Sequence, residues 1–470
     1  MALVIAGGRV VTAADDFIAD VLVDGERIAM IGANLSDRAD SVIDATGAYV
    51  LPGGVDPHTH IEGGFVHTPV RDDFTSGTVA AVCGGTTTVV NFCPQAQGQP
   101  FSDLLSEWHR RLGASPPVAD VGFHVSVVDL SVGGLAELVA AGVPSFKLFM
   151  AYKGRMMVDD ETLFATMQIA AGCGALVMVH AENGGAIEVL IGEALARGDT
   201  SPIWHSRTRP PELEGEATAR AIDLARLAGC PLYVVHVSCC EALEPVVRGR
   251  TAGWEVWAET CTQYLFTDES MLERPDFEGA KFVFTPPPRT EVDRRRLWDA
   301  LAAGTLSVVS TDHVPYAWDE HKTLSRNDFS KIPNGAPGIE DRLAMLHHFG
   351  VGERRISLGK LVALTATQPA KLFGLYPKKG TVAVGGDADL VVFDPSATRT
   401  ISAAMQRSKS DYNLYEGTSV TGAPRDVLVR GQLVVRDGEL IAEPGVGTFL
   451  PRAPFAPSRH GGAVGGAPEQ

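Results

Sequence analysis

The chain has 470 residues, of which 45% are hydrophobic and 21% charged, and 57 acidic against 40 basic side chains give a formal net charge of −17. This composition is typical of a globular protein and excludes a disordered chain, a collagen and a small disulfide scaffold. The negative charge argues against binding of nucleic acid or of an anionic membrane, because both would be repelled.

The seven cysteines lie in or beside apolar runs, which predicts reduced thiols of a cytoplasmic protein instead of a disulfide framework. The first ten residues lack a basic segment, and no stretch reaches the ~18 apolar residues of a membrane span. We therefore expect neither a signal peptide nor a transmembrane helix. The length predicts a large domain together with a smaller one.

Both ends of the chain have the pattern of short β-strands. Residues 1–50 contain strand-like runs broken by turn residues, with Gly7-Gly8 and Asp24-Gly25 as hairpin signals. A similar pattern returns within residues 376–450. We predict that these two segments form one small β-sandwich. The segment 451–470 is rich in Pro, Gly and Ala, which predicts an extended tail outside the core.

Apolar strands alternate with helical patterns in the central segment, residues 51–375. Helices are expected at 160–171 and 214–228, among others. Strands are predicted at residues 48–56, 86–92, 118–128, 145–149, 176–180, 232–237, 255–260 and 306–311. This alternation is typical of a parallel sheet covered by helices, and its length suits an α/β fold of the (β/α)₈ TIM-barrel type. An open doubly wound sheet is the alternative, although no Gly-x-Gly-x-x-Gly follows the first strand.

Metal-type side chains fall at the carboxyl ends of several predicted strands. They are His58, His60, His180, His236 and Asp312, and the fourth strand also carries Lys147. In a barrel these ends form one rim, where active sites are built. His58 and His60 are two residues apart, so they share one face of an extended segment. Nitrogen and oxygen ligands of this kind suit catalytic zinc, with manganese or cobalt as substitutes.

Lys147 is unusual in this set, because an ammonium group repels metal ions and is costly in an apolar strand. Two interpretations remain open. Lys147 forms a salt bridge with Asp312, or its neutral amine takes up carbon dioxide and the carbamate bridges two cations. In the second case His58, His60, Lys147 and Asp312 bind one metal ion, and Lys147, His180 and His236 bind the other.

Several motifs in this order resemble the dihydropyrimidinase/D-hydantoinase family of cyclic amidohydrolases. They are GGVDPHTHIE, SFKLFMAYK, MVHAENG, VVHVSC, FTPPPR, STDHVPY and IPNGAPGIEDR. The resemblance implies a (β/α)₈ barrel with a β-sandwich made from both termini, and a homotetramer. It also implies that the six residues above are the metal ligands, with Lys147 carboxylated to N6-carboxylysine.

The same resemblance implies a hydrolase acting on C–N bonds in cyclic amides. A water activated by two metal ions would open the ring amide bond of a dihydropyrimidine or a 5-substituted hydantoin, giving an N-carbamoyl amino acid. Asp312 would act as general base and Tyr152 would donate to the developing oxyanion. Main-chain groups of Thr285 and Asn334 would hold the substrate imide.

The loop from Glu62 to Arg71 departs from the family pattern, which leaves the substrate preference open. His67 and Arg71 would read a polar substituent or face solvent. The loops 93–100 and 153–159, the latter with two methionines, are also expected to line the pocket. An allantoinase-type hydrolase remains an alternative.

Two further relatives are less favoured. A dihydroorotase is less favoured because Glu62 would repel an anion at the position where that family carries arginine. A non-enzymatic scaffold protein would have lost metal ligands, which this chain retains.

Three smaller features remain. His347 and His348 are expected to form a surface pair, and Cys239 and Cys240 to be buried thiols. His313, next to Asp312, either hydrogen bonds to the site or packs beside it.

Overall fold

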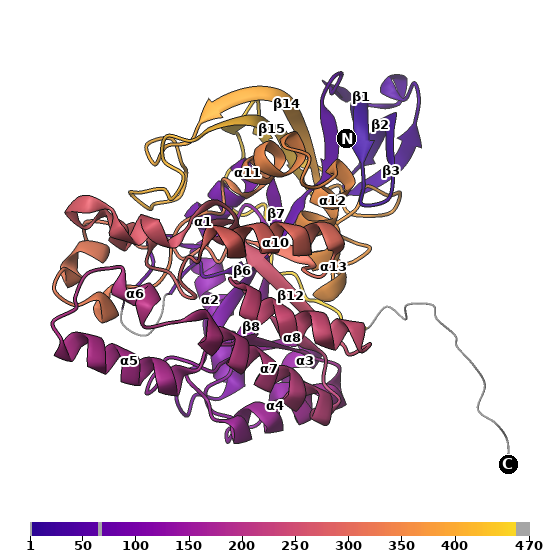
Figure 1. Ribbon diagram of the computed structural model, residues 1–470. Helices are drawn as coiled ribbons and strands as arrows, with labels where there is room; N and C mark the ends of the chain where they lie inside the picture. The colour runs from indigo at the N-terminus through magenta and orange to yellow at the C-terminus, as the bar shows by residue number, and fades with distance from the viewer. Residues whose placement is uncertain (1, 64–67, 457–470) are drawn as a thin grey trace, which may run out of the picture.

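The computed structural model describes residues 2–63 and 68–456 of the chain (Figure 1). Its centre is an eight-stranded sheet in which neighbours along the chain are neighbours in space and every pair is parallel. The strands are β6 (Gly54–Thr59), β7 (Thr86–Pro94), β8 (Asp120–Ser126), β9 (Ser145–Phe149), β10 (Leu176–His180), β11 (Leu232–Val234), β12 (Val256–Cys261) and β13 (Val308–Ser310).

The first and last strands of this sheet meet, which closes the barrel. Thr59 and His313 form a parallel bridge, and the His60 amide donates to the His313 carbonyl at 2.9 Å. Below that bridge, the Thr311 hydroxyl donates to the Asp56 carboxylate at 2.6 Å. The (β/α)₈ prediction is therefore confirmed, and the open doubly wound sheet is excluded.

Helices surround the barrel, with α4, α5, α7 and α8 across the lower half of Figure 1. The helices are α1 (Phe74–Cys83), α2 (Phe101–Ala114), α3 (Leu135–Ala140), α4 (Asp160–Cys173), α5 (Gly184–Ala196), α6 (Trp204–Arg207), α7 (Pro211–Ala228), α8 (Cys240–Thr251), α9 (Thr262–Phe266), α10 (Glu291–Ala303), α11 (Arg342–Met345), α12 (Leu358–Val362) and α13 (Gln368–Leu372). The predicted helices 160–171 and 214–228 correspond to α4 and α7. Helix α4 begins where Asp159 accepts from the Thr162 amide at 2.8 Å and ends at Gly174, whose φ of +72° favours glycine.

A second sheet of nine strands combines the two ends of the chain. Its strands are β1 (Ala2–Val11), β2 (Asp16–Asp24), β3 (Arg27–Gly32), β4 (Ser41–Asp44), β5 (Tyr49–Pro52), β14 (Leu390–Thr400), β15 (Ser419–Val429), β16 (Gln432–Arg436) and β17 (Glu439–Leu440). The antiparallel pair β5–β14 joins the N-terminal strands to the C-terminal ones. Figure 1 shows both groups at the top of the view, in indigo and in orange. The two ends therefore combine as predicted, but the structure joins them in one continuous sheet where the sequence predicts a β-sandwich.

Two strand predictions near the N-terminus are wrong in detail. Asp24-Gly25 does form the β2–β3 hairpin, but Gly7-Gly8 lies inside β1, where the register against β2 shifts between Ile5 and Gly8. Gly7 has a φ of +69°, so these glycines form a bulge instead of a turn. The predicted strand 48–56 is two strands: β5 belongs to the nine-stranded sheet and β6 starts the barrel.

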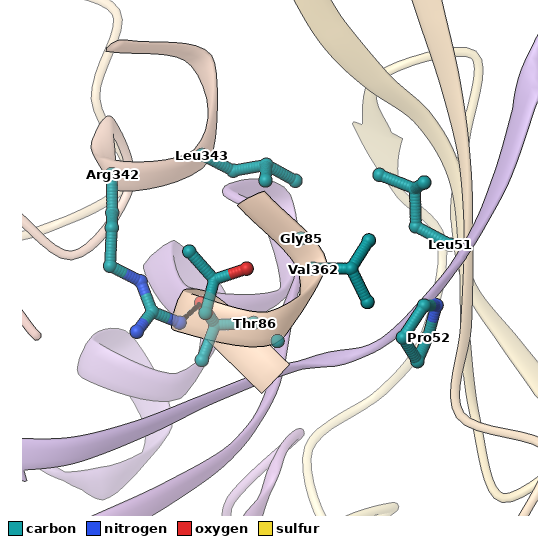
Figure 2. Close-up of a pocket in the computed structure, with 9 residues that line it drawn as sticks. Leu51, Pro52, Gly85, Thr86, Arg342, Leu343 and Val362 are labelled. Carbon is teal, nitrogen blue, oxygen red and sulfur yellow. Dashed lines mark hydrogen bonds between the residues drawn. The ribbon is translucent and has the colours of Figure 1, made fainter. Parts of the chain in front are cut away.

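Arg342 joins three barrel strands, and Figure 2 shows its guanidinium beside Thr86 of β7. Its fully buried guanidinium donates to the carbonyls of Val55 and Val309, both at 3.1 Å, and to the Thr86 hydroxyl at 2.9 Å. The cavity in Figure 2 lies beside it, against β5, and has a volume of about 10 Å³. Because that is room for about one water, it is a packing gap and not a ligand site.

The C-terminal segment contradicts part of the tail prediction. Residues 451–456 were expected outside the core, yet Arg452 is only 3% exposed and donates to the Ser145 hydroxyl at 2.6 Å. Leu450 is also buried, and its amide donates to the Val121 carbonyl at 2.8 Å. Main-chain hydrogen bonds to Gly142, Gly174 and Gly374 hold this segment, and amino-acid composition alone does not reveal them. The residues 457–470 lie outside the described part of the chain.

The remaining histidine and cysteine predictions have mixed outcomes. His347 and His348 are not a surface pair, because both ring Nδ1 atoms hydrogen bond to the main chain of Thr421 in β15, at 2.8 and 3.1 Å. All seven cysteines are free thiols, as expected; Cys239 is buried, whereas Cys240 is only partly buried. Within residues 2–63 and 68–456, we find no helix with the length and apolarity that a bilayer crossing requires.

Candidate active site

The six metal-type side chains converge at the carboxyl ends of the barrel strands. All are buried: they are His58 in β6, His60 after β6, Lys147 in β9, His180 at the end of β10, His236 after β11 and Asp312 after β13. They share one small cavity of about 20 Å³ with Tyr152, Thr285 and Asn334. The fold therefore brings together every residue that the sequence placed in the site.

The first group consists of His58, His60 and Asp312. The Nε2 atoms of the two histidines lie 3.0 and 3.2 Å from the same oxygen, Asp312 Oδ1. Burial alone would raise the pKa of Asp312, but the two imidazoles outweigh it and hold that pKa well below its usual range. Two nitrogens and a carboxylate oxygen at these separations form a set of ligands able to hold one metal ion.

The second group consists of His180, His236 and Lys147. His180 Nδ1 lies 2.8 Å from His236 Nε2, and the His58 and His236 ring centroids are 5.4 Å apart, so the two groups adjoin. Lys147 Nζ lies 4.6 Å from the centre of the Phe92 ring. The salt bridge with Asp312 is not formed, since Lys147 takes part in no ion pair within the described ranges.

Burial lowers the pKa of Lys147 to about 8, against the opposing effects of Asp312 and Glu259. About a tenth of the amine is therefore neutral at pH 7, far more than for an ordinary lysine, and the neutral amine is the form that reacts with carbon dioxide. A buried ring nitrogen, His236 Nδ1, also has no hydrogen-bond partner in the part of the chain described. Unpaired buried nitrogens are costly unless a ligand binds them, so this donor set fits metal ions.

Two carboxylates orient the histidines from behind. Glu259 Oε1 lies 2.5 Å from His58 Nδ1, and the Tyr233 hydroxyl donates to Glu259 Oε2 at 2.9 Å. Glu182 Oε2 lies 2.8 Å from His180 Nε2. Such partners fix the orientation of an imidazole and raise its basicity as a ligand. Neither glutamate was predicted from the sequence, although a glutamate inside the apolar strand β12 (Val256–Cys261) is a signal of a buried polar contact.

His313 hydrogen bonds at the edge of the site instead of only packing there. Its Nε2 lies 3.0 Å from Asp72 Oδ2, and its Nδ1 accepts from the Gly338 amide at 3.1 Å. Asp72 also accepts from the Ser408 hydroxyl at 2.6 Å. His313 therefore holds the segment after Asp312 to two loops that surround the rim.

Three site residues have left-handed backbone conformations. The φ angles are +67° at Tyr152, +40° at His236 and +47° at Asp312. Each residue lies where the chain leaves a strand, so the unusual φ redirects its side chain at the rim. Such conformations cost of the order of 1–3 kcal/mol each and occur most often at functional sites.

Tyr152, Thr285 and Asn334 lie together beside the metal-type cluster. The Asn334 amide donates to the Tyr152 hydroxyl at 3.4 Å, and burial raises the pKa of Tyr152, which keeps the phenol protonated. The Thr285 hydroxyl lies 3.3 Å from His205 Nε2. A protonated phenol here is a hydrogen-bond donor aimed into the site.

A buried lysine that the sequence analysis missed connects the segments carrying Thr285 and Asn334. Lys322 Nζ donates to the Val283 and Pro333 carbonyls, both at 2.7 Å, and is fully buried. These carbonyls lie two residues before Thr285 and one before Asn334. Only the fold reveals this contact, because nothing near position 322 in the sequence marks it.

A larger chamber opens outside the cluster and shares Tyr152 and Asn334 with it. Its volume is about 430 Å³, and Met156 of the predicted pocket loop 153–159 lines it. The predicted pocket loop 93–100 does not: its described residues line neither cavity, and Gln95 folds back to the Gln99 carbonyl at 2.9 Å.

Among the described residues of the Glu62–Arg71 loop, Thr68 lines the chamber, as predicted for this loop, whereas Glu62 and Arg71 do not. The Glu62 carboxylate accepts from the Ser115 hydroxyl at 3.2 Å and does not line the chamber, so its expected repulsion of an anion is not supported. Arg71 forms an exposed ion pair with Glu320. His67 lies outside the described residues.

A closed parallel barrel with clustered metal-type ligands at the carboxyl ends of its strands defines the class of metal-dependent (β/α)₈ enzymes. More narrowly, the chain belongs to the amidohydrolase family, whose sequence profile matches residues 49–434.

The chain is similar to several known proteins over nearly its full length. It is 49% identical to a D-hydantoinase of Geobacillus stearothermophilus and 46% identical to a D-hydantoinase of Rhizobium radiobacter, covering 97% of this chain in both cases and 97% and 100% of the relatives. The crystal structure of a dihydropyrimidinase from Brevibacillus agri superposes with a TM-score of 0.95 at 48% identity, covering 97% of this chain and all of that one.

Proposed function

We propose that the protein is a metal-dependent cyclic amidohydrolase that opens the ring amide bond of 5-substituted hydantoins or dihydropyrimidines to give N-carbamoyl amino acids. The convergence of His58, His60, Lys147, His180, His236 and Asp312 on one buried site is the observation that carries this proposal. Similarity to D-hydantoinases over 97% of the chain supports the substrate class.

We infer that the site holds two divalent ions, with zinc expected and manganese or cobalt as substitutes. His58, His60 and Asp312 would bind one ion, His180 and His236 the other, and carboxylated Lys147 both. When bound, the ions would polarise the scissile carbonyl and lower the pKa of an attacking water. The depressed pKa of the Lys147 amine and the unpaired His236 Nδ1 support this assignment.

The side chains around that centre would carry the proton transfers. Asp312 would accept a proton from the attacking water and return it to the ring nitrogen as the C–N bond breaks. The Tyr152 phenol would donate a hydrogen bond to the carbonyl oxygen as negative charge develops on it. Main-chain groups of Thr285 and Asn334 would hold the substrate imide in position.

A hydrolysis panel tests the proposal. The zinc-loaded protein is assayed with hydantoin, phenylhydantoin, dihydrouracil, allantoin and dihydroorotate. Turnover of hydantoins or dihydrouracil is expected. Turnover of allantoin alone would replace the proposal with an allantoinase activity, and turnover of none would refute it.

Lys147→Ala tests the metal assignment separately. Both ions and the activity should be lost together, because the variant lacks the group that bridges them. A variant that keeps two ions per chain by elemental analysis would contradict the bridging role.

We further propose a homotetrameric assembly in the cytoplasm, supported by the family resemblance. Light scattering on the purified protein measures the assembly directly, and a monomer would contradict it.

A further inference from the structure

The chamber outside the catalytic cluster is unusually cationic for a chain with a net charge of −17. Among the described residues, its charged lining side chains are four cations, Lys153, Arg155, Arg209 and Lys331, and one carboxylate, Glu188. Between them lies an apolar wall that includes buried Met156, Ile191 and Ile332. An apolar wall with a positive rim suits an aliphatic group that ends in a negative charge.

Most of these cations lack a carboxylate partner. Lys331 pairs with Asp328 at 2.9 Å on its own turn. In contrast, none of the ion pairs in the described ranges involves Lys153, Arg155 or Arg209. A cation without a fixed counter-ion at the wall of a cavity is available to a ligand.

Arg209 is the deepest of the four, with 7% of its surface exposed. Its Nη1 lies 3.1 Å from His205 Nδ1, and His205 Nε2 in turn lies 2.9 Å from the Phe284 carbonyl. Glu182 is a buried carboxylate close enough to Arg209 to attract it, but its own hydrogen bond is to His180. The buried guanidinium therefore adds positive charge to the chamber wall, and it forms no ion pair with any residue that the structure describes.

The volumes of the two cavities indicate that a substituent on the substrate ring would lie in the chamber. The space among the metal-type ligands is about 20 Å³, which is room for about one water, so a ring at that cluster must extend outward. The only shared lining residues are Tyr152 and Asn334, and beyond them the described chamber offers about 430 Å³. A group on the ring carbon would enter it.

We propose that the chamber selects cyclic ureides whose ring substituent ends in an anion, such as a carboxylate on a short alkyl chain. Arg155 and Lys153 bind the anion at the rim, and Arg209 stabilises it from the wall. This inference rests on the proposed function, because it names the substrate class of the same site. It also reverses the expectation from Glu62, whose carboxylate is hydrogen bonded to Ser115 and away from the chamber.

A matched pair of substrates tests the charge alone. We would compare kcat/KM for 5-(2-carboxyethyl)hydantoin with that for its neutral isostere, 5-(2-carbamoylethyl)hydantoin, using the zinc-loaded protein. Ring opening creates the same new carboxylate in both products, so the two reactions differ only in the charge of the substituent. The carboxylate substrate should be favoured by about tenfold or more, and higher ionic strength should reduce that preference.

Substitutions of Arg155 test whether the cations at the rim cause the preference for the carboxylate substrate. Arg155→Gln should lower the preference about two- to fivefold, as expected for one exposed charge, and Arg155→Glu should lower it further. Arg110→Gln is the matched control, because Arg110 is an exposed arginine of α2 that does not line the chamber. Its preference should equal that of the wild type.

Two results would overturn the proposal: a wild-type preference for the neutral isostere, or an equal preference in the wild type and both Arg155 variants. Unsubstituted hydantoin separates this failure from failure of the proposed function. If it is hydrolysed while the carboxylate is not favoured, the selectivity proposal fails and the amidohydrolase proposal stands. If no cyclic ureide is hydrolysed, both fail.

Discussion

Lys322 offers a test of how the substrate-binding segments are held. Replacing it by methionine keeps an unbranched side chain that is one atom shorter and removes the amine. The Val283 carbonyl would still accept from the Gly335 amide at 3.1 Å, but the Pro333 carbonyl would lose its only hydrogen-bond donor among the described residues. Leaving one buried carbonyl unsatisfied costs about 1–3 kcal/mol.

The catalytic consequence should exceed what this loss of stability explains. Asn334 directly follows Pro333, so a loosened carbonyl moves a residue that we place at the substrate imide. A displacement of about 1 Å in such a group costs on the order of 100-fold in rate. We therefore expect kcat/KM to fall about 10- to 100-fold in Lys322→Met, with a rise in KM because the imide contact also binds the ground state.

The assay combines steady-state kinetics on hydantoin, urea unfolding and elemental analysis. Lys322→Gln retains an N–H donor and should lie between the wild type and Lys322→Met. Lys281→Met is the control, because that partly buried lysine pairs with Glu278 instead of with the two segments. If Lys322→Met loses stability while kcat and KM stay at wild-type values, Lys322 supports only the fold and the reasoning is refuted.

Three further predictions concern other residues of the site and its surroundings. Tyr152→Phe should lower kcat by about 10²–10³-fold with the metal content unchanged, measured by kinetics and elemental analysis; an unaltered kcat would exclude an oxyanion role. Glu259→Gln should weaken metal affinity about 10–100-fold in competition with a chelator, because His58 loses its orienting carboxylate, and equal affinity would contradict that role. Burial raises the pKa of Glu340 to about 7 from a usual 4.5, against the opposing effect of Arg407. The folded state therefore binds more protons between these values, so the free energy of unfolding should fall by about 1–3 kcal/mol from pH 5 to pH 7. Glu340→Gln should reduce this slope in urea unfolding, and an unchanged slope would show that another group titrates.

The fold and the metal-type ligands were predictable because their signals are local. Each of these side chains lies in or just after a segment predicted as a strand, and the carboxyl ends of parallel strands meet at one rim whatever the exact strand boundaries are. His180 and His236 therefore fall together although 56 residues separate them. The prediction of one strand over residues 48–56 is wrong in detail, but the error does not move His58 away from the rim.

Contacts between distant segments were not predictable in this way. Glu259 and Lys322 act on atoms 201 and 39 residues away, and their partners are known only once the barrel is closed. His347 and His348 resemble a surface pair in sequence, but β15 arrives beside them from the other end of the chain. Burial of Arg452 depends in the same way on a segment that returns to the barrel.

Different parts of the rim therefore position the metal-type side chains and select the substrate. The strands fix the ligand positions, and the residues just beyond them adopt left-handed backbone conformations at Tyr152, His236 and Asp312 to direct side chains inward. Substrate selection belongs to the more distant loops, where Arg155 and Lys153 are exposed and outside any ion pair of the described residues. A change in these loops can therefore alter which substituent is accepted without moving a ligand, because the buried carboxylates Glu259 and Glu182 hold the histidines independently of the chamber.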